Sequence, residues 1–282
     1  MNLNSNVTVI IPCYNDGEFI LEALHSVLNQ TLKAEKIIII DDGSNKETKA
    51  VLRGIKVDGV TVITQENKGV SHARNKAIDL ATSNYILNLD ADDYLESTFI
   101  EKAVEILNKN EKVAVVGAYC RNFTGKNTDV DIVKPLGGEV KDFIVKNNGR
   151  ANSLFRKQSW AAVGGYDEKM LNGYEDWEFW IAILKLGDSM HIIKEVLTHY
   201  RIKRTSRDQT ALSKYDFELR KYIFNKHKDV FKEHFEFYTQ ELLRINSVLK
   251  NNVLKVKESK NYKIGSFFSN PFKLLKRAIN GQ

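Results

Sequence analysis

Short apolar runs alternate with helical patterns of apolar residues through the first half of the chain. Strands are expected at residues 7–11, 36–40, 60–64, 85–89 and 113–119. Helices are expected between them, at residues 18–29, at 71–81 and from 98 onward. The isoleucine run at 36–40 has no polar alternation, which is typical of a parallel strand covered on both faces. The pattern predicts an α/β fold with a doubly wound sheet that binds ligands at the carboxyl ends of its strands.

The second half of the chain is patterned differently. Residues 124–150 are polar and weakly patterned, which suggests an excursion that lines the site. Residues 160–186 are rich in aromatic side chains and are expected to be helical toward their end, and residues 213–249 have helical periodicity. Thr98 and Glu101 form the pattern of a capping box at the start of the helix near residue 98.

Composition and charge narrow the class of protein. Apolar residues make up 43% and charged residues 28% of the chain, which is ordinary for a soluble globular protein. No run of roughly eighteen apolar residues predicts a spanning helix, and the first residues lead directly into a strand without a secretory signal pattern. Cys13 and Cys120 form neither a disulfide framework nor a metal motif, which fits a reducing cytoplasm.

The net charge of +6 would suit an anionic partner. No zinc-ligand spacing or aromatic RNA-binding signature accompanies it, so we expect no nucleic acid among the partners. Basic residues are concentrated after Lys250, where the sequence contains seven lysine and arginine residues and one acidic residue, Glu258.

Three carboxylates follow the fourth expected strand, at Asp90, Asp92 and Asp93. Such close carboxylates repel one another unless a positive charge lies between them. Hard oxygen ligands suit Mg²⁺ or Mn²⁺, which can also bridge a substrate diphosphate. The alternative is a solvated acidic turn whose charges favour the start of the next helix.

Two further motifs follow strands at the same edge. Asp42 could accept hydrogen bonds from a base or a ribose, although the segment also reads as a βα turn capped by Ser44 or Asn45. Lys68 precedes a helix whose first amide groups could meet a phosphate, or which could be an ordinary capped surface helix.

Glu175 and Asp176 stand beside several aromatic side chains, among them Trp177. Aromatic rings stack on the apolar faces of sugars, and a carboxylate can act as a general base. The alternative is a buried helix whose acidic residues lie in its first turn for electrostatic reasons.

Taken in order, these motifs resemble the inverting family 2 glycosyltransferases of GT-A fold, of the bacterial surface-polysaccharide type. The resemblance is carried by residues 7–15, 26–31, 41–44, 67–69, 73–75, 90–93, 164–167 and 175–177. It implies a GT-A catalytic domain at 1–210, with a nucleotide-binding half at about 1–120 and an acceptor-binding half at 121–210. Residues 211–282 would form a helical C-terminal extension with a basic amphipathic tail.

The resemblance also implies roles for single residues. The nucleotide sugar would be bound by Pro12, Tyr14, Asp42, Lys68 and Asp90. The metal, Mn²⁺ or Mg²⁺, would be held by Asp92 and Asp93.

On the acceptor side, the resemblance makes Asp176 the catalytic base, with Glu175 beside it. Trp177 and Arg156 are expected to contact the acceptor.

The implied reaction is the inverting transfer of a hexose from a nucleotide-diphosphate sugar to a hydroxyl of a glycan or lipid-linked acceptor. The resemblance implies UDP as the nucleotide. The setting would be polysaccharide biosynthesis for the cell envelope. Processive synthases carry a QxxRW signature and membrane helices, which this sequence lacks, so a single addition is expected. The alternative is a catalytically silent nucleotide-sugar-binding scaffold. A nucleotidyltransferase is less favoured because no Gly-rich basic loop follows the first strand.

The chain departs from the family pattern at Lys203, where many members have histidine. Either Lys203 acts electrostatically or His199 substitutes from a neighbouring position, and the sequence leaves both open. The basic amphipathic segment at 264–279 could lie on the inner face of the plasma membrane, or pack on its own domain or on a second subunit.

Overall fold

The computed structural model describes residues 5–125, 128–203 and 207–268. The chain divides into two units, Met1–Glu233 and His234–Gln282, which are described separately. The domain boundary expected at residue 210 stays a prediction, and the division by internal packing falls after Glu233.

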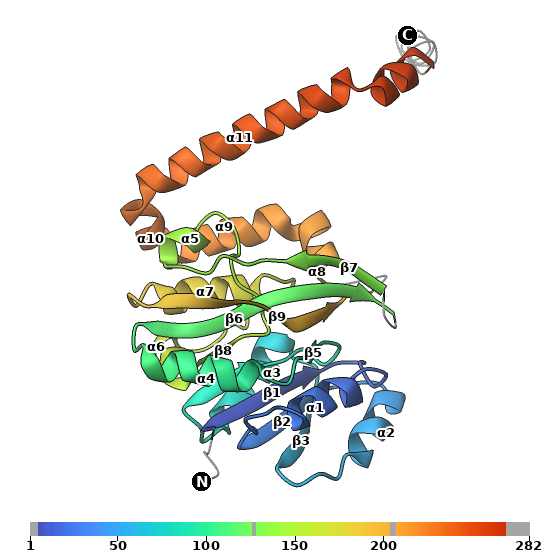
Figure 1. Cartoon of the computed structure of the whole chain (residues 1–282), viewed down its shortest axis with the longest axis vertical. Helices are drawn as coiled ribbons and strands as arrows, with labels where there is room; N and C mark the ends of the chain where they lie inside the picture. Colours follow the sequence, from blue (N-terminus) through green and yellow to red (C-terminus); the bar gives the residue numbers. More distant parts are fainter. Residues whose placement is uncertain (1–4, 126–127, 204–206, 269–282) are drawn as a thin grey trace. The chain divides into compact units, whose positions relative to one another are not determined.

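The first unit is built on one sheet in the order β3-β2-β1-β4-β8-β6-β9-β5, with β7 paired to β6 (Figure 1). The strands of its parallel half are β1 (Val7–Cys13), β2 (Lys36–Asp42), β3 (Val60–Gln65) and β4 (Tyr85–Asn88). The other strands are β5 (Tyr94–Leu95), β6 (Val113–Thr124), β7 (Thr128–Val133), β8 (Leu154–Arg156) and β9 (Ser189–Arg201).

Helices cover both faces of the sheet, as the unbroken apolar strands predict. The first face packs on α1 (Ile20–Leu28), α2 (Lys46–Gly54) and α4 (Phe99–Lys109). The second face packs on α3 (Val70–Asp79), α6 (Lys157–Val163) and α7 (Glu175–Leu184). All seven residues of β1 are buried, so this strand forms the centre of the core. The predicted α/β alternation is confirmed through β4.

Two strands that the sequence pattern did not predict join the parallel half to the rest of the sheet. β8 has three residues and runs antiparallel between β4 and β6. β9 has thirteen residues of mixed exposure and pairs with β6 in parallel. Their signal is weak because β8 is too short to show a period, and because the pairing of β9 depends on a strand far away in the sequence. The expected excursion at 124–150 contains β7 and the short helix α5 (Val140–Phe143).

The helix caps were predicted with mixed success. Asn45 caps α2 by accepting from the Thr48 amide at 2.9 Å, as one of the two expected candidates. The capping box at α4 is wrong, because the Thr98 side chain makes no capping bond and Glu101 instead accepts from the Thr31 hydroxyl. The amide of Ile100 in the first turn of α4 donates to the side chain of Gln30, 3.0 Å away. A residue distant in sequence therefore does the capping.

The chain continues as helices after β9. They are α8 (Arg207–Thr210), the π-helix η1 (Ala211–Tyr215), α9 (Asp216–Lys226), α10 (Lys228–Glu233) and, in the second unit, α11 (Phe235–Glu258). Residues 260–268 are also helical, so the helical C-terminal region is confirmed. Of the basic amphipathic segment expected at 264–279, residues 269–279 lie outside the described residues. Within the described part of the chain, no helix is both long and apolar enough to cross a membrane.

Gln30 offers a test of this architecture, because its fully buried amide also donates to the carbonyl oxygens of Ser26 and Glu96. Gln30→Leu removes three hydrogen bonds and leaves buried polar groups without partners. We expect the free energy of unfolding, measured in urea, to fall by about 3 kcal/mol. Gln158→Leu on the exposed side of α6 is the matched control and should change it by less than about 0.5 kcal/mol. Equal effects of the two variants would contradict the capping role.

Candidate active site

The acidic and polar residues singled out in the sequence gather where β1, β2 and β4 end. These strands are parallel neighbours, so their carboxyl ends lie at one edge of the sheet. Tyr14 follows β1 and is 51% exposed, whereas Pro12 within the strand is buried. Asn15 adopts a left-handed conformation with φ 62°, and its side chain accepts from the Asn45 amide at 2.7 Å. The loop after β1 is thereby fixed to the loop after β2.

The two aspartates that end β2 have different surroundings because successive strand residues face opposite sides of a sheet. Asp42 accepts from the Gln65 side chain at 2.8 Å and from the amides of Lys68 and Gly69 at 2.9 Å each. Gly69 has φ 89°, a conformation that favours glycine. The Asp42 carboxylate therefore holds the loop that carries Lys68, whose own side chain is exposed.

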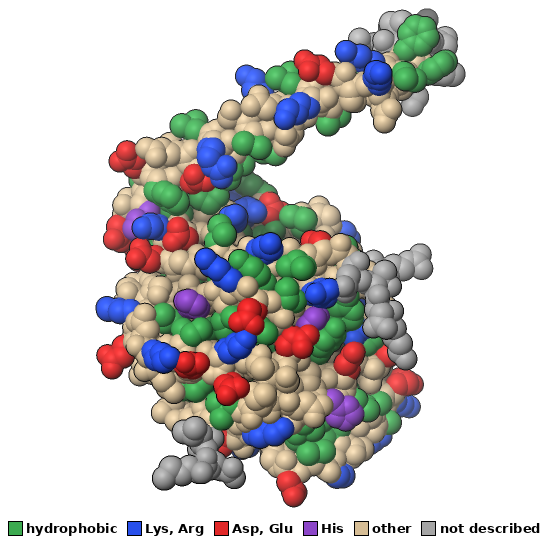
Figure 2. All heavy atoms as spheres, in the orientation of Figure 1, with side chains coloured by type: hydrophobic (Ala, Val, Ile, Leu, Met, Phe, Trp, Pro, Cys, Tyr) green, Lys and Arg blue, Asp and Glu red, His purple; other side chains and the backbone are tan. Residues whose placement is uncertain are grey.

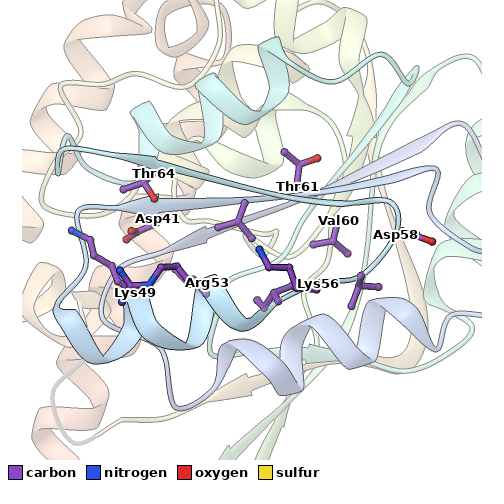
Figure 3. A pocket seen from close by; sticks show the side chains of 12 residues that line it. Asp41, Lys49, Arg53, Lys56, Asp58, Val60, Thr61 and Thr64 are labelled. Carbon is purple, nitrogen blue, oxygen red and sulfur yellow. The ribbon is translucent and has the colours of Figure 1, made fainter.

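Asp41 lies on the opposite face, beside a groove of about 790 Å³ between α2 and β3 (Figure 3). Its Oδ1 accepts from the Ser44 amide at 2.8 Å. Lys49, Arg53 and Lys56 of α2 and its following loop also line this groove. Neither Asp90 nor any other carboxylate of the motifs after β4 lines it, so the groove is separate from the acidic edge.

A buried arginine joins the motifs of three different elements. Arg74 of α3 is 1% exposed, and its Nε donates to Asn88 Oδ1 at the end of β4, 2.9 Å away. Its two terminal nitrogens bind Asp90 at 2.8 Å and Glu175 at 2.9 Å. The guanidinium also lies over the ring of Tyr166, 5.3 Å from its centroid. Burial opposes the charge on Arg74, but the two carboxylates outweigh it and the net effect is a raised pKa.

The residue after Arg74 holds the glycine motif at 164–167. The Asn75 side chain accepts from the Tyr166 amide at 2.8 Å and donates to the Tyr166 carbonyl at 2.9 Å. Gly165 has φ 87°, and a Cβ there would lie 2.7 Å from Asn75 Oδ1. Two segments ninety residues apart in sequence are thus packed without room for a side chain at Gly165. The resemblance motifs at 73–75 and 164–167 are parts of one contact.

Asp92 is paired with a cation of the protein itself. Lys203 Nζ lies 2.8 Å from Asp92 Oδ2 and also forms an ion pair with Asp16 in the loop after β1. Burial lowers the pKa of Lys203, but the two carboxylates outweigh it and the net pKa is raised. Burial also raises the pKa of Asp92, and Lys203 opposes this shift.

The two candidate residues at the departure from the family pattern have different surroundings. His199 is buried, stacks on the Tyr94 ring at 4.1 Å and has its Nε2 2.8 Å from Glu96 Oε1. Lys203, and not His199, meets the acidic motif after β4.

Asp93 points into the protein and is 1% exposed. Its two oxygens accept from the Asn152 side chain at 2.6 Å and from the Arg201 amide at 2.9 Å. Burial, followed by the charges of Asp92 and Asp90, raises the pKa of this carboxyl well above its usual value. The contacts of Asp93 connect the loop after β4 to the end of β9.

The second acidic pair lies at the start of α7. Gly173 and Tyr174 have φ values of 114° and 61°, and this left-handed turn leads the chain into the helix. Glu175 is buried against Arg74, whereas Asp176 is partly exposed. Asp176 Oδ2 accepts from the Asn147 side chain at 2.8 Å, so the excursion after β7 contributes a contact to this carboxylate.

The side chains of Trp177 and Arg156, the residues expected at the acceptor, both donate to backbone carbonyl oxygens of the protein. Trp177 is 4% exposed and donates its ring N–H to the Phe143 carbonyl at 2.6 Å. Arg156 pairs with Tyr85 at the beginning of β4, the end opposite to Asp90, and donates to carbonyl oxygens that include those of Leu107 and Val113. The structure does not bring Arg156 to the acidic edge.

Carboxylate oxygens suit a hard divalent cation, but much of the available set is already used. Asp90 binds Arg74 through one carboxylate oxygen, and its side chain is 29% exposed. Asp92 binds Lys203 through one carboxylate oxygen, and its side chain is 18% exposed. The second oxygen of each carboxylate could bind a metal ion. Among the described residues, no group of three or more Asp, Glu, His or Cys is arranged to hold a metal ion. A metal here would fit only if a ligand such as a diphosphate completed its coordination.

Sequence reasoning noted Arg74 only as part of a helix-start motif and missed its role as the shared partner of Asp90 and Glu175. Asn147, Asn152 and Asp16 were missed entirely. A charged residue at a position of the helix that faces the core is the signal that could have pointed to Arg74. The asparagines carry no such signal because their partners are far away in the sequence.

The comparison with protein families identifies the class of protein as a glycosyl transferase. The model described as "Glycosyl transferase family 2" matches residues 8–161, more than half of the 282-residue chain. The chain belongs to this family, and the resemblance inferred from its motifs is confirmed.

Individual relatives agree with this assignment. The chain is 27% identical over 218 residues to the chondroitin synthase of Escherichia coli, covering 75% of this chain and 31% of that protein. It is 27% identical over 205 residues to the glycosyltransferase MJ1057 of Methanocaldococcus jannaschii, covering 70% of each. It thus spans about a third of the length of the chondroitin synthase.

Among solved structures, TarS of S. aureus (residues 1–349, in complex with UDP-GlcNAc) is similar in fold. The TM-score is 0.65 at 18% identity, covering 91% of this chain and 77% of that chain. The predicted GT-A architecture with a helical C-terminal region is confirmed by this likeness.

The buried pairs of Arg74 can be tested by substitution. Arg74→Met leaves Glu175 buried without its cation, and we expect the free energy of unfolding to fall by about 3 to 5 kcal/mol. Adding Glu175→Gln should recover part of this loss, because the double variant no longer buries an unpaired charge. Urea unfolding measures both, and Arg53→Met at an exposed position of α2 is the control. An unchanged stability in Arg74→Met would refute the linking role.

Proposed function

We propose that the protein transfers a sugar from a nucleotide-diphosphate sugar to a hydroxyl of a glycan or lipid-linked acceptor, with inversion at the anomeric carbon. The proposal rests mainly on the two ion pairs of Arg74, with Asp90 and with Glu175. They connect the loop after β4 to the start of α7. A displacement reaction needs its leaving-group site and its base at a fixed separation, and one shared buried cation would provide this.

Asp176 is the proposed base. It is the partly exposed member of its pair and lies in the first turn of α7. Asn147 holds one carboxylate oxygen and the Trp177 amide, 2.7 Å away, holds the other. Asp176 would take the proton of the acceptor hydroxyl as that oxygen attacks the anomeric carbon and the bond to the diphosphate breaks. Glu175 and Trp177, both buried, would position Asp176 and would not touch the acceptor.

The donor would lie along the ends of β1, β2 and β4. We propose that the exposed Tyr14 ring stacks on the nucleobase of the donor. Asp42 would contribute by holding the loop that carries Lys68, whose side chain is exposed. UDP is the expected nucleotide, since the TarS structures include complexes with UDP and UDP-GlcNAc. Donor and acceptor identities would fit a role in polysaccharide synthesis, as in the chondroitin synthase relative.

Asp90 and Asp92 would hold Mn²⁺ or Mg²⁺ together with the diphosphate, in preference to Asp93, whose two oxygens are already bonded. Such a cation supplies positive charge to the departing nucleoside diphosphate. Lys203 would add a second positive charge at the same place by turning from Asp92 toward a phosphate oxygen. We also propose that the segment at 264–279 touches a membrane, a contact consistent with the exposed rings of Phe267 and Phe268. A cytoplasmic location stays a prediction.

Donor binding can be measured by thermal shift with UDP, GDP, dTDP and CMP, each with and without Mn²⁺. One nucleoside diphosphate should raise the melting temperature in a metal-dependent way, equivalent to about 2.7 kcal/mol at a hundredfold excess over its dissociation constant. Asp92→Ala should abolish the metal-dependent part, and Lys203→Met should weaken binding with and without metal. Asp58→Asn, at an exposed position, is the control. No shift with any nucleotide in folded protein would count against the donor site.

The base is tested by Asp176→Asn, which keeps the shape of the side chain but cannot accept the proton. We expect the release of nucleoside diphosphate in the presence of acceptor oligosaccharides to fall by about 100- to 10,000-fold. The donor affinity from the thermal shift should stay within about twofold. Retained turnover would exclude Asp176 as the base. Absence of turnover in the wild type, with donor binding intact, would favour a silent nucleotide-sugar-binding scaffold.

A further inference from the structure

Within the second unit, none of the described residues covers the apolar side chains of its long helix. α11 has 24 residues and none of them is buried. Leu242, Leu249 and Val256 are 44%, 58% and 59% exposed, and hydrophobic side chains are visible along this helix in Figure 2. At 1.5 Å per residue the helix is about 36 Å long. An isolated helix is only marginally stable in water, so a helix of this composition is expected to have a covering partner.

The spacing of the apolar residues indicates what kind of surface covers them. One series of positions recurs at alternating intervals of three and four residues, six of them apolar and one an asparagine. The positions are Phe235, Tyr238, Leu242, Ile245, Leu249, Asn252 and Val256. The other exposed apolar side chains of the helix lie outside this series, at Phe237, Leu243, Val248, Val253 and Leu254. The 3.5-residue period of the series keeps one seam of the helix in register with a second helix over three heptads. It therefore indicates a paired helix as the occupant.

The charges of α11 indicate which helix this is. Residues 235–246 hold two acidic residues and one basic residue, a net charge of −1, and residues 247–258 hold three basic residues and one acidic residue, a net charge of +2. A helix that lies on an anionic membrane carries basic residues along its whole polar face. A charge that changes sign along the helix is instead complementary to the same helix running in the opposite direction.

We propose that α11 pairs antiparallel with α11 of a second copy of this chain. Placing Leu249 of one copy against Ile245 of the other also places Leu242 against Asn252. In this register Glu241 lies beside Lys255 of the second copy, and the twofold axis repeats the contact. A parallel pair would bring the two basic ends together. The proposal concerns assembly and does not depend on the transfer reaction.

Light scattering of the full chain during size-exclusion chromatography tests the pairing. We expect a mass of twice 32.3 kDa for the wild type. Leu249→Glu places a charge in the seam and should give a mass of one chain at the same concentration. The control is Leu254→Glu, a similarly exposed leucine of the same helix, about 140° around it from Leu249, which should remain dimeric.

Charge reversal tests the direction of the helices. Glu241→Lys or Lys255→Glu alone replaces two attractions by two repulsions, which should raise the dissociation constant of the dimer about tenfold. The double variant should restore association, because opposite charges again face each other between copies. Restoration would not occur in a parallel pair, where residues 241 and 255 lie two heptads apart. A dimer whose double variant stays weak would overturn the antiparallel register.

Other outcomes would overturn the pairing itself. A wild type that is monomeric at all concentrations has no such interface, and its cosedimentation with phosphatidylglycerol vesicles would show that lipid covers this helix. A dimer that persists in Leu249→Glu would place the interface elsewhere on the chain. Circular dichroism of each variant, compared with the wild type, checks that the first unit remains folded.

Discussion

The arrangement of the site depends on one buried positive charge. A guanidinium cannot lose its hydration in the core unless carboxylates and acceptors replace the water. Arg74 meets this requirement with Asp90, Glu175 and the amide oxygen of Asn88, which belong to the end of β4 and the start of α7. Because a half-completed set would leave a buried charge unpaired, the loop after β4 and the start of α7 must be in place together. The geometry between the proposed donor and acceptor sides follows from this constraint.

The other charges at this edge are also balanced within the chain. Lys203 lies between Asp92 and Asp16, so the segment after β9 contributes a cation to the loops that follow β4 and β1. Asp93 belongs to the same four-residue cluster as Asp90 and Asp92, but its two oxygens accept hydrogen bonds from the Arg201 amide and the Asn152 side chain. A run of carboxylates therefore divides into partly exposed groups, which can meet a ligand, and a buried group that connects segments. Burial and partners separate them, while residue type does not.

The sheet has a regular parallel half and a second half in which strand directions are mixed. In its parallel half, buried strands and covering helices follow one another along the chain, and local patterns are sufficient to locate them. Beyond β4, the three-residue β8 runs antiparallel and joins this half to β6 and β9. That irregular part provides Asn147, Asn152 and Lys203, which are the contacts specific to this site. The family assignment rests on the segment from residue 8 to 161, whereas Lys203 and α11 lie outside it.

The sequence by itself determined the α/β alternation, the cluster of acidic residues at strand ends and the family, because strand burial and βα turns leave local patterns. It also placed Asp42 near the end of a strand, although the strand includes it, and Asp176 correctly at the start of a helix. Only the tertiary structure decided that Gln30 rather than Thr98 caps α4, that Lys203 rather than His199 meets Asp92, and that Arg156 lies at the far end of β4. Each of these contacts joins residues dozens of positions apart. Their free energy depends on burial and distance, which a linear pattern does not encode.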